Sequence, residues 1–324
     1  MDEGQSTFIL DHINFTARVQ YLGGKTPRQG DQLARGPAPQ YGKSRDSRII
    51  VRVGADLGCR FLSPRRALMP DFTTVCEEAA RAGGEILLSW QGRFKVREKG
   101  PADLVTEADL ASQKAIAEVV LGHFPAHEFL GEEEEGDKTL GDDYCWIVDP
   151  LDGTTNYVHG APQFCVSVAL THERRVISGA VWDPIAKECY AATEGQGVTL
   201  NGEPIRVSSV EQLSQGLVAA SFPTQIDRQS EEIGRFLDVL TSCQALRRMG
   251  SAALNLCWLA SGRFDGYWAT NTKVWDIAAG TLIVQEAGGV VTALDGGPLD
   301  VQSGQFLAAS TPEMHTELRA KLGW

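Results

Sequence analysis

The 324-residue chain predicts a mixed α and β protein, part antiparallel sheet and part alternating strands and helices. Three observations lead to this class. Apolar residues recur at helical spacing in two early segments, near-continuous apolar runs of strand length fill the middle, and strands alternate with buried helices near the end. Apolar residues make up 43% of the chain and charged residues 22%, which excludes a disordered or collagen-like protein.

Two helices are predicted early in the folded part of the chain. The first follows Met69, where Asp71 can cap it. The second runs over about residues 106–120 and ends at Gly122. Residues 97–102 fit no periodic pattern, which predicts a loop between the two helices.

The middle of the chain predicts a meandering, mainly antiparallel sheet. The apolar run 144–148 predicts a buried strand that ends at Asp149 and Pro150, because proline cannot continue a central ladder. The run 164–170 alternates large with small residues and has almost no polar ones, which predicts a strand covered on both faces. Further strands are predicted at 176–182 and 188–192, with a hairpin turn at Asn201-Gly202.

The last third of the chain predicts an α/β half. A helix is predicted at 251–261 and is closed by Gly262. A second helix at 275–287 is apolar nearly all round, so we expect it to be buried. Strands are predicted at 264–269 and 290–293.

Charge divides the chain near residue 68. Residues 1–68 hold 11 Lys+Arg and 6 Asp+Glu, whereas residues 69–324, the body, hold 19 and 36. The first segment lacks sustained periodicity and shows no secretory signal. It is interpreted either as a disordered basic extension or as sequence translated in error upstream of a true start at Met69.

Composition also bounds the partners and the compartment. The net charge of −12 argues against a nucleic-acid protein that works by general electrostatics. No stretch approaches the roughly 18 apolar residues of a membrane span, so no membrane partner is expected. The seven cysteines are scattered without a Cys-x-x-Cys pair, which disfavours a disulfide scaffold or structural zinc site and indicates a cytoplasmic protein.

The most informative motif is the turn after the strand 144–148. Asp149 and Asp152 stand three residues apart with the Leu151 carbonyl between them, and such hard oxygen donors suit Mg²⁺. Gly153 and Thr154 are placed to open a helix, whose free N–H groups suit a phosphate. The alternative is an Asp-rich turn with a capping threonine.

Three other segments with acidic residues bear on that choice. Glu132 and Glu133 follow a short apolar run, Thr106 and Asp109 open the second helix, and Asp276 is a lone acid at the start of a buried helix. Each has a simpler interpretation as an exposed acidic face, a capping box or a helix cap, respectively. A buried carboxylate is costly unless it is paired or binds a metal, which keeps the metal hypothesis open for Asp276.

Together these segments resemble the inositol monophosphatase family, within the metal-dependent, lithium-sensitive phosphatases that include fructose-1,6-bisphosphatase. The resemblance runs from about Met69 to the end and is carried by the motifs at 131–133, 146–157, 275–280 and 285–289. It implies a layered αβαβα sandwich with an active site between two halves, 69–213 and 214–324. A cytoplasmic homodimer with a small phosphorylated substrate is the expected assembly.

The resemblance also implies a metal centre. Glu132, Asp149 and the Leu151 carbonyl would hold one Mg²⁺, and Asp149, Asp152 and Asp276 would hold a second. Glu132 could touch a third, weaker ion, and Mn²⁺ can substitute for Mg²⁺.

Roles at the phosphate follow from the same resemblance. The N–H groups of Gly153 and Thr154 would face the phosphate, and Thr154 with Asp109 would orient and deprotonate the attacking water. Supporting positions would be Glu133, Thr155 and Lys99, the last on a mobile loop.

The implied activity is hydrolysis of inositol-1-phosphate or a related sugar or polyol monophosphate. The glutamate that binds sugar hydroxyls in inositol-specific members falls here on Ala269, which leaves Asp152, Ser251 and Ala252 as substrate contacts. Because Ala269 cannot accept a hydrogen bond, broad specificity is expected. Alternatives are a histidinol-phosphate or nucleotide phosphatase of the same family, or a non-catalytic binding protein on this fold.

Overall fold

The computed structural model describes residues 8–10, 13–15, 71–100, 103–134, 139–223 and 226–324. Strands β1 (Phe8–Leu10) and β2 (Ile13–Phe15) form an antiparallel pair in a first unit of the chain. All other described elements belong to a second unit. Most of residues 1–68 lie outside the described residues, so both interpretations of that segment stay open.

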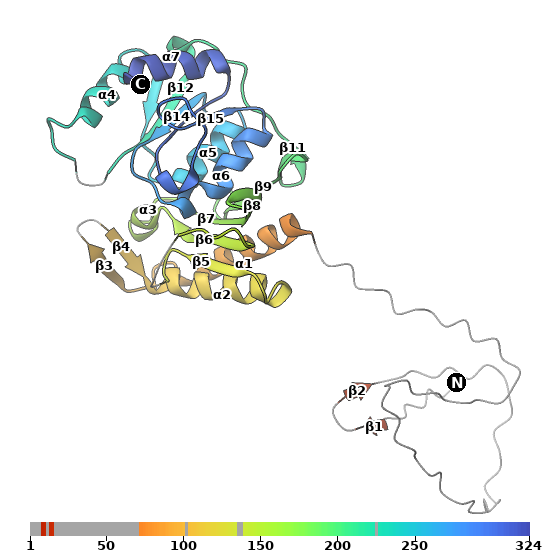
Figure 1. The fold of residues 1–324 in the computed structure, drawn as a ribbon. Coiled ribbons are helices and arrows are strands. Elements are labelled where there is room, and N and C mark those ends of the chain that lie inside the picture. The colour runs from red at the N-terminus through yellow and green to blue at the C-terminus, as the bar shows by residue number, and fades with distance from the viewer. Residues whose placement is uncertain (1–7, 11–12, 16–70, 101–102, 135–138, 224–225) are drawn as a thin grey trace, which may run out of the picture. The chain divides into compact units, whose positions relative to one another are not determined.

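Five layers build the body in the order helices, sheet, helices, sheet, helices (Figure 1), which confirms the predicted αβαβα sandwich. The first sheet has the order β11-β10-β9-β8-β7-β6-β5 and is antiparallel except for the β5–β6 pair, as the predicted meander requires. Its strands are β5 (Glu128–Gly131), β6 (Cys145–Asp152), β7 (Cys165–His172), β8 (Arg175–Asp183), β9 (Glu188–Thr193), β10 (Gly197–Leu200) and β11 (Glu203–Pro204).

Two helices cover the outer face of this sheet. Helix α1 (Phe72–Trp90) packs on β7 and β8, and helix α2 (Glu107–His123) packs on β6. Asp71 caps α1 as predicted, because its carboxylate accepts the Thr74 N–H at 2.9 Å. The β3 (Val96–Gly100) and β4 (Asp103–Thr106) strands form an antiparallel pair between the helices.

The central layer consists of α5 (Ala252–Ala260) and α6 (Val274–Glu286). Helix α6 packs on β7 and β8 on one side and on β15 on the other, so it is buried as predicted. The two helices approach closely at Gly280, where a Cβ atom would meet the Leu256 side chain at 2.5 Å. This layer carries the largest core, which joins both sheets.

The second sheet has five strands of mixed direction in the order β13-β12-β14-β16-β15. They are β12 (Leu217–Ser221), β13 (Ala245–Arg247), β14 (Gly266–Ala269), β15 (Val290–Thr292) and β16 (Phe306–Ala309). Helices α4 (Glu231–Leu240) and α7 (Pro312–Leu322) form the last layer. The division of the body at residue 213 remains a prediction. None of the described helices is long and apolar enough to cross a membrane.

The predicted end of β6 is wrong in a way that matters for the site. The strand does not stop at Asp149 and Pro150 but continues to Asp152. Its register with β7 shifts between Asp149 and Asp152, so the proline lies at a bulge where no ladder hydrogen bond is needed.

Two other boundaries also differ. Helix α2 does not end at Gly122 but runs to His123, and the Phe124 N–H then donates to the Val120 carbonyl at the C-terminus. Much of the predicted loop 97–102 is strand β3, which pairs with β4. A five-residue strand held by a single partner has too little hydrophobic pattern to be detected in the sequence.

We predict that a chain beginning at Met69 unfolds at the same temperature as the full chain, within about 2 °C. The reason is that the cap of α1 and all residues of the three core clusters lie after that position. Thermal unfolding followed by circular dichroism measures this. A drop of several degrees would show that residues 1–68 stabilise the body.

Candidate active site

The turn between β6 and α3 (Thr154–Val158) carries the acidic pair that the sequence singles out. Asp149 and Asp152 are 2% and 8% exposed. The Leu151 N–H donates to Asp149 Oδ1 at 2.9 Å, and the Thr154 hydroxyl donates to the Leu151 carbonyl at 3.1 Å. Gly153 has a φ of 94°, and a Cβ there would meet a backbone carbonyl at 2.7 Å. Glycine therefore allows the chain to turn sharply into α3, whose first N–H groups lack helical partners.

Asp152 ties the first sheet to the central helices. Its carboxylate accepts hydrogen bonds from the Ser251 hydroxyl at 2.6 Å, the Ala253 N–H at 2.7 Å and the Ala252 N–H at 3.2 Å. Ser251 also accepts the Leu254 N–H at 3.2 Å and so caps α5. Burial raises the pKa of Asp152, and these hydrogen bonds act in the opposite direction. The predicted substrate contacts Ser251 and Ala252 therefore lie at this carboxylate.

Asp276 lies in the first turn of α6 and accepts the Lys273 N–H at 2.8 Å, so its interpretation as a helix cap holds. It is also part of an acidic cluster. Burial raises the pKa of Asp149 well above its usual value, and the charges of Glu132, Asp152 and Asp276 raise it further. The pKa of Asp276 is also raised well above its usual value, mainly by burial and next by the charge of Asp152. The structure thus brings together acids from three distant segments of the chain.

The donors of this cluster fit a hard divalent cation. Asp149, Asp152 and Asp276 form no ion pair with Lys or Arg among the described residues, although their charges repel. In the described ranges no group of three acidic, His or Cys side chains is arranged so that it could hold a metal ion. The fit therefore rests on uncompensated negative charge and on carboxylate donors, which Mg²⁺ prefers.

Glu132 and Glu133 follow strand β5 and are half-buried. The Glu132 N–H donates to the Val148 carbonyl at 3.1 Å, which fixes this loop against β6. The Glu133 N–H donates to Gln113 Oε1 at 2.9 Å. Gln113 also packs against Gly131, where a Cβ atom would meet it at 2.3 Å. This α2 residue positions the loop of Glu132, and no motif in the sequence indicated it.

Asp109 serves as the capping residue that the simpler interpretation predicts. Its Oδ2 accepts the Thr106 N–H at 3.0 Å and the Thr106 hydroxyl at 2.5 Å. The side chain is 1% exposed, and this burial raises its pKa to about 6, with a smaller contribution from Glu133. No hydrogen bond joins Asp109 to Thr154 among the described residues, so their joint action on a water stays a prediction.

The remaining predicted site residues differ in their exposure to solvent and in how much of them the structure describes. Thr155 is exposed in the first turn of α3, and Lys99 lies in β3 with a side chain outside the described set. Ala269 is fully buried at the end of β14. Thr270 and Asn271 line a pocket, so the accessible surface of this segment begins one residue after the position that the resemblance indicates.

Two further positioning residues could not be found from the sequence. Ser112 on α2 donates to the Pro150 carbonyl at 2.9 Å and holds the bulge of β6. Asn156 on α3 donates to the Gln163 carbonyl at 2.7 Å and to the Met249 carbonyl at 2.8 Å, which links α3 to the segment before α5. The Ser112–Pro150 and Asn156–Met249 contacts join residues far apart in the chain, and no local pattern indicates such pairs.

Comparison with protein families matches residues 69–323 to the inositol monophosphatase family. The match covers nearly all of the layered body, and the class of protein is therefore a phosphoric monoester hydrolase. The chain belongs to the inositol monophosphatase family, and the resemblance noted in the sequence is confirmed.

Individual relatives agree over the same region. The chain is 40% identical over 257 residues to Inositol monophosphatase 1 of Solanum lycopersicum, which covers 77% of this chain and 94% of the relative. It is 37% identical over 252 residues to Nus factor SuhB of Pseudomonas aeruginosa, which covers 75% and 93%. The solved structure of inositol monophosphatase from Anabaena has a TM-score of 0.69 at 36% identity and covers 78% of this chain and 95% of that one.

We predict that Ser251→Ala destabilises the body by about 2 kcal/mol, because it removes both a helix cap and a hydrogen bond to a buried carboxylate. The unfolding temperature should fall by about 5 °C. The matched control is Ser230→Ala, because Ser230 is also a helix N-cap but makes no side-chain cap bond. Equal effects of the two substitutions would show that the bond to Asp152 contributes no stability.

Proposed function

We propose that this protein is a Mg²⁺-dependent phosphomonoesterase that hydrolyses inositol-1-phosphate or a related small sugar or polyol monophosphate. The observation that supports it most is the acidic cluster of Asp149 and Asp152 at the β6–α3 turn with Asp276 of α6, in which neighbouring charges help to raise the pKa of Asp149 and Asp276. Membership of a metal-dependent phosphatase family supports it as well. Phosphate-monoester hydrolysis is very slow without catalysis and depends on charge neutralisation and positioning.

The acids and one carbonyl are the proposed metal ligands. Glu132, Asp149 and the Leu151 carbonyl would hold one ion, and Asp149, Asp152 and Asp276 a second, with Glu132 available to a third. Mg²⁺ or Mn²⁺ bound there would supply positive charge that activates a water and stabilises the leaving oxygen. The bulge in β6 supports this assignment, because it places Asp149 and Asp152 on one short turn.

The remaining steps belong to the chain's own groups. The N–H groups of Gly153 and Thr154 at the start of α3 would hold the phosphate oxygens. Thr154 would orient the attacking water through its hydroxyl, and Asp109 would accept the proton. Burial keeps the pKa of Asp109 near 6, so its carboxylate is ionised at neutral pH and is a stronger base than an exposed aspartate. Glu133, Thr155 and Lys99 would support the site from its edges.

The residues on the substrate side of the site support a broad substrate specificity. With Ala269 buried and apolar, no acid stands at that position to select sugar hydroxyls. Asp152, Ser251 and Ala252 are the proposed contacts to the leaving group, and we expect several small monophosphates to react. Histidinol phosphate and nucleotide monophosphates remain alternative substrates, to be included in the same screen.

Relatives named Nus factor SuhB favour a second candidate function as a Nus factor. The body holds 36 Asp+Glu and 19 Lys+Arg, and this negative charge disfavours general electrostatic binding to nucleic acid. We therefore consider the Nus-factor role the less favoured of the two functions. Hydrolysis of small monophosphates by the purified protein separates the two. A homodimer remains the proposed assembly.

We predict that hydrolysis requires Mg²⁺ or Mn²⁺ and that Asp149→Asn lowers kcat/KM by at least about a hundredfold, because this carboxylate is assigned to both ions. Phosphate release is measured with and without chelator. Mg²⁺ should also raise the unfolding temperature of the wild type but not of the variant. Asp143→Asn, an exposed change six residues away, is the control. Full activity in chelator would contradict the proposal.

We predict an acid limb in the pH profile of kcat/KM with a midpoint near the pKa of Asp109, about 6. A base must be ionised to accept a proton, so the rate rises as pH increases through this value. Asp109→Asn should remove the limb and most of the activity, whereas Glu107→Gln in the same helical turn should keep both. A limb that persists in Asp109→Asn would assign the titration to another group.

A further inference from the structure

Ser167 on β7 links the two segments that carry Asp149 and Asp276. In the first sheet it stands directly opposite Asp149 of β6. Its hydroxyl donates to the Trp275 carbonyl, in the first turn of α6, at 3.2 Å, and the residue is 1% exposed. Ser167 therefore joins the strand pair of one proposed metal ligand to the helical turn of another.

Small residues let α6 approach the first sheet closely at this place. On β7, Cys165 and Ala169 belong to the core that contains α6, and Ser167 lies between them on the same face. On the neighbouring strand β8, a Cβ atom at Gly179 would meet Ala279 of α6 at 3.0 Å. The backbone of α6 is thus close enough to the sheet for the short serine side chain to reach a helix carbonyl.

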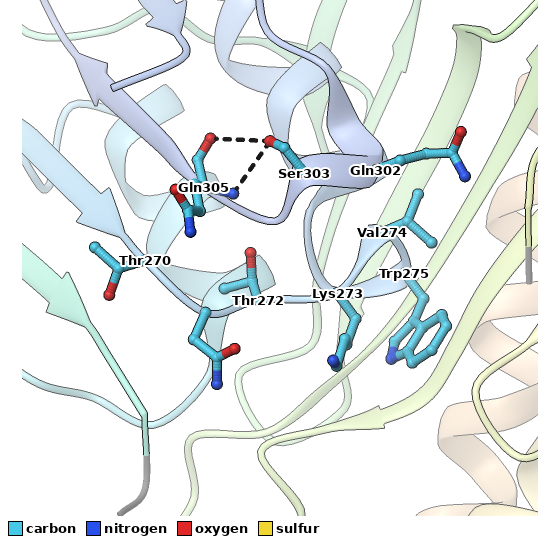
Figure 2. Close-up of a pocket in the computed structure, with 9 residues that line it drawn as sticks. Thr270, Thr272, Lys273, Val274, Trp275, Gln302, Ser303 and Gln305 are labelled. Carbon is cyan, nitrogen blue, oxygen red and sulfur yellow. Dashed lines mark hydrogen bonds between the residues drawn. The ribbon is translucent and has the colours of Figure 1, made fainter. Parts of the chain in front are cut away.

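The first turn of α6 also borders a cavity. A polar pocket of about 370 Å³ opens beside it, and Lys273, Val274 and Trp275 are among the residues that line this pocket (Figure 2). The Lys273 N–H donates to Asp276 Oδ2 at 2.8 Å, but this bond lies within the turn itself. The bond from Ser167 instead connects the turn to the sheet, so it fixes where the turn stands relative to β7.

Such a connection matters because the acids on its two sides repel each other. The charge of Asp276 is among the causes that raise the pKa of Asp149, so each carboxylate disfavours the ionised form of the other. This repulsion acts to move the first turn of α6 away from β6. The bond between Ser167 and the Trp275 carbonyl opposes that movement.

We propose that Ser167 is a positioning residue that holds Asp276 close to Asp149, so that both carboxylates can bind the second ion. This inference rests on the proposed function and deepens it. Inside α6 the Trp275 carbonyl also belongs to the hydrogen-bond ladder of the helix, so Ser167→Ala leaves it with a partner. The substitution should therefore alter ion binding more than stability.

The test measures Mn²⁺ binding to the full chain by electron paramagnetic resonance, which detects the free ion and needs no substrate. We expect Ser167→Ala to weaken the second ion, shared by Asp149 and Asp276, about fivefold, which is the effect of one ordinary hydrogen bond. The first ion, which Glu132 and the Leu151 carbonyl help to hold, should bind as in wild type. Without metal, the unfolding temperature should stay within about 2 °C of wild type.

The matched control is Ser178→Ala on β8, because Ser178 is also 1% exposed but its hydroxyl is hydrogen-bonded to that of Thr73 on α1 at 2.8 Å. This variant should bind both ions as wild type does. Unchanged binding in Ser167→Ala, or an equal loss in Ser178→Ala, overturns the positioning role, while hydrolysis of inositol-1-phosphate by wild type keeps the phosphatase function. A wild type that neither binds Mn²⁺ nor hydrolyses a monophosphate would contradict the proposed function itself.

Discussion

The arrangement of the body depends on how three acids, two of them buried, are held close together. Asp149, Asp152 and Asp276 repel one another, and burial raises the pKa of each. Three helices begin at this place, α3 at Gly153, α5 at Ser251 and α6 at Lys273. Helix N-termini carry partial positive charge and free N–H groups, which offset part of the repulsion. The layers must therefore meet where the acids are, and the central helices are oriented accordingly.

The hydrogen bonds of Asp152 and Asp276 show this dependence directly. Asp152 ends a strand of the first sheet but is satisfied by α5, and Asp276 closes the first turn of the helix that packs between both sheets. A local change at either carboxylate therefore reaches the contact between layers. A metal bound there, as proposed, would complete the neutralisation that the helices begin and would thereby couple ion binding to the packing of the layers.

Much of this could be predicted from the sequence because it is local. The apolar runs of β6 and β7, the Asp71 cap and the Asn201-Gly202 turn depend on neighbours within a few residues. The end of β6 was missed because a bulge, which depends on the partner strand, makes Pro150 acceptable. Contacts such as Gln113 with the loop of Glu132 join distant segments. Family resemblance supplied the grouping of the acids, which periodicity alone does not contain.

The same division between local and distant contacts separates the acidic turn from the pocket beside α6. The acids and the helix starts that hold them occupy the tight β6–α3 turn, where Gly153 and Pro150 leave little freedom. The exposed pocket residues Asn271 and Lys273 instead lie in the loop before α6 and outside the core clusters, whereas Val274 and Trp275 of the same lining belong to the core. Side chains there can change without disturbing the buried charges, because Lys273 holds Asp276 through its backbone N–H rather than through its side chain. Substitutions of the exposed residues in this loop can therefore alter the pocket while the proposed metal ligands keep their positions.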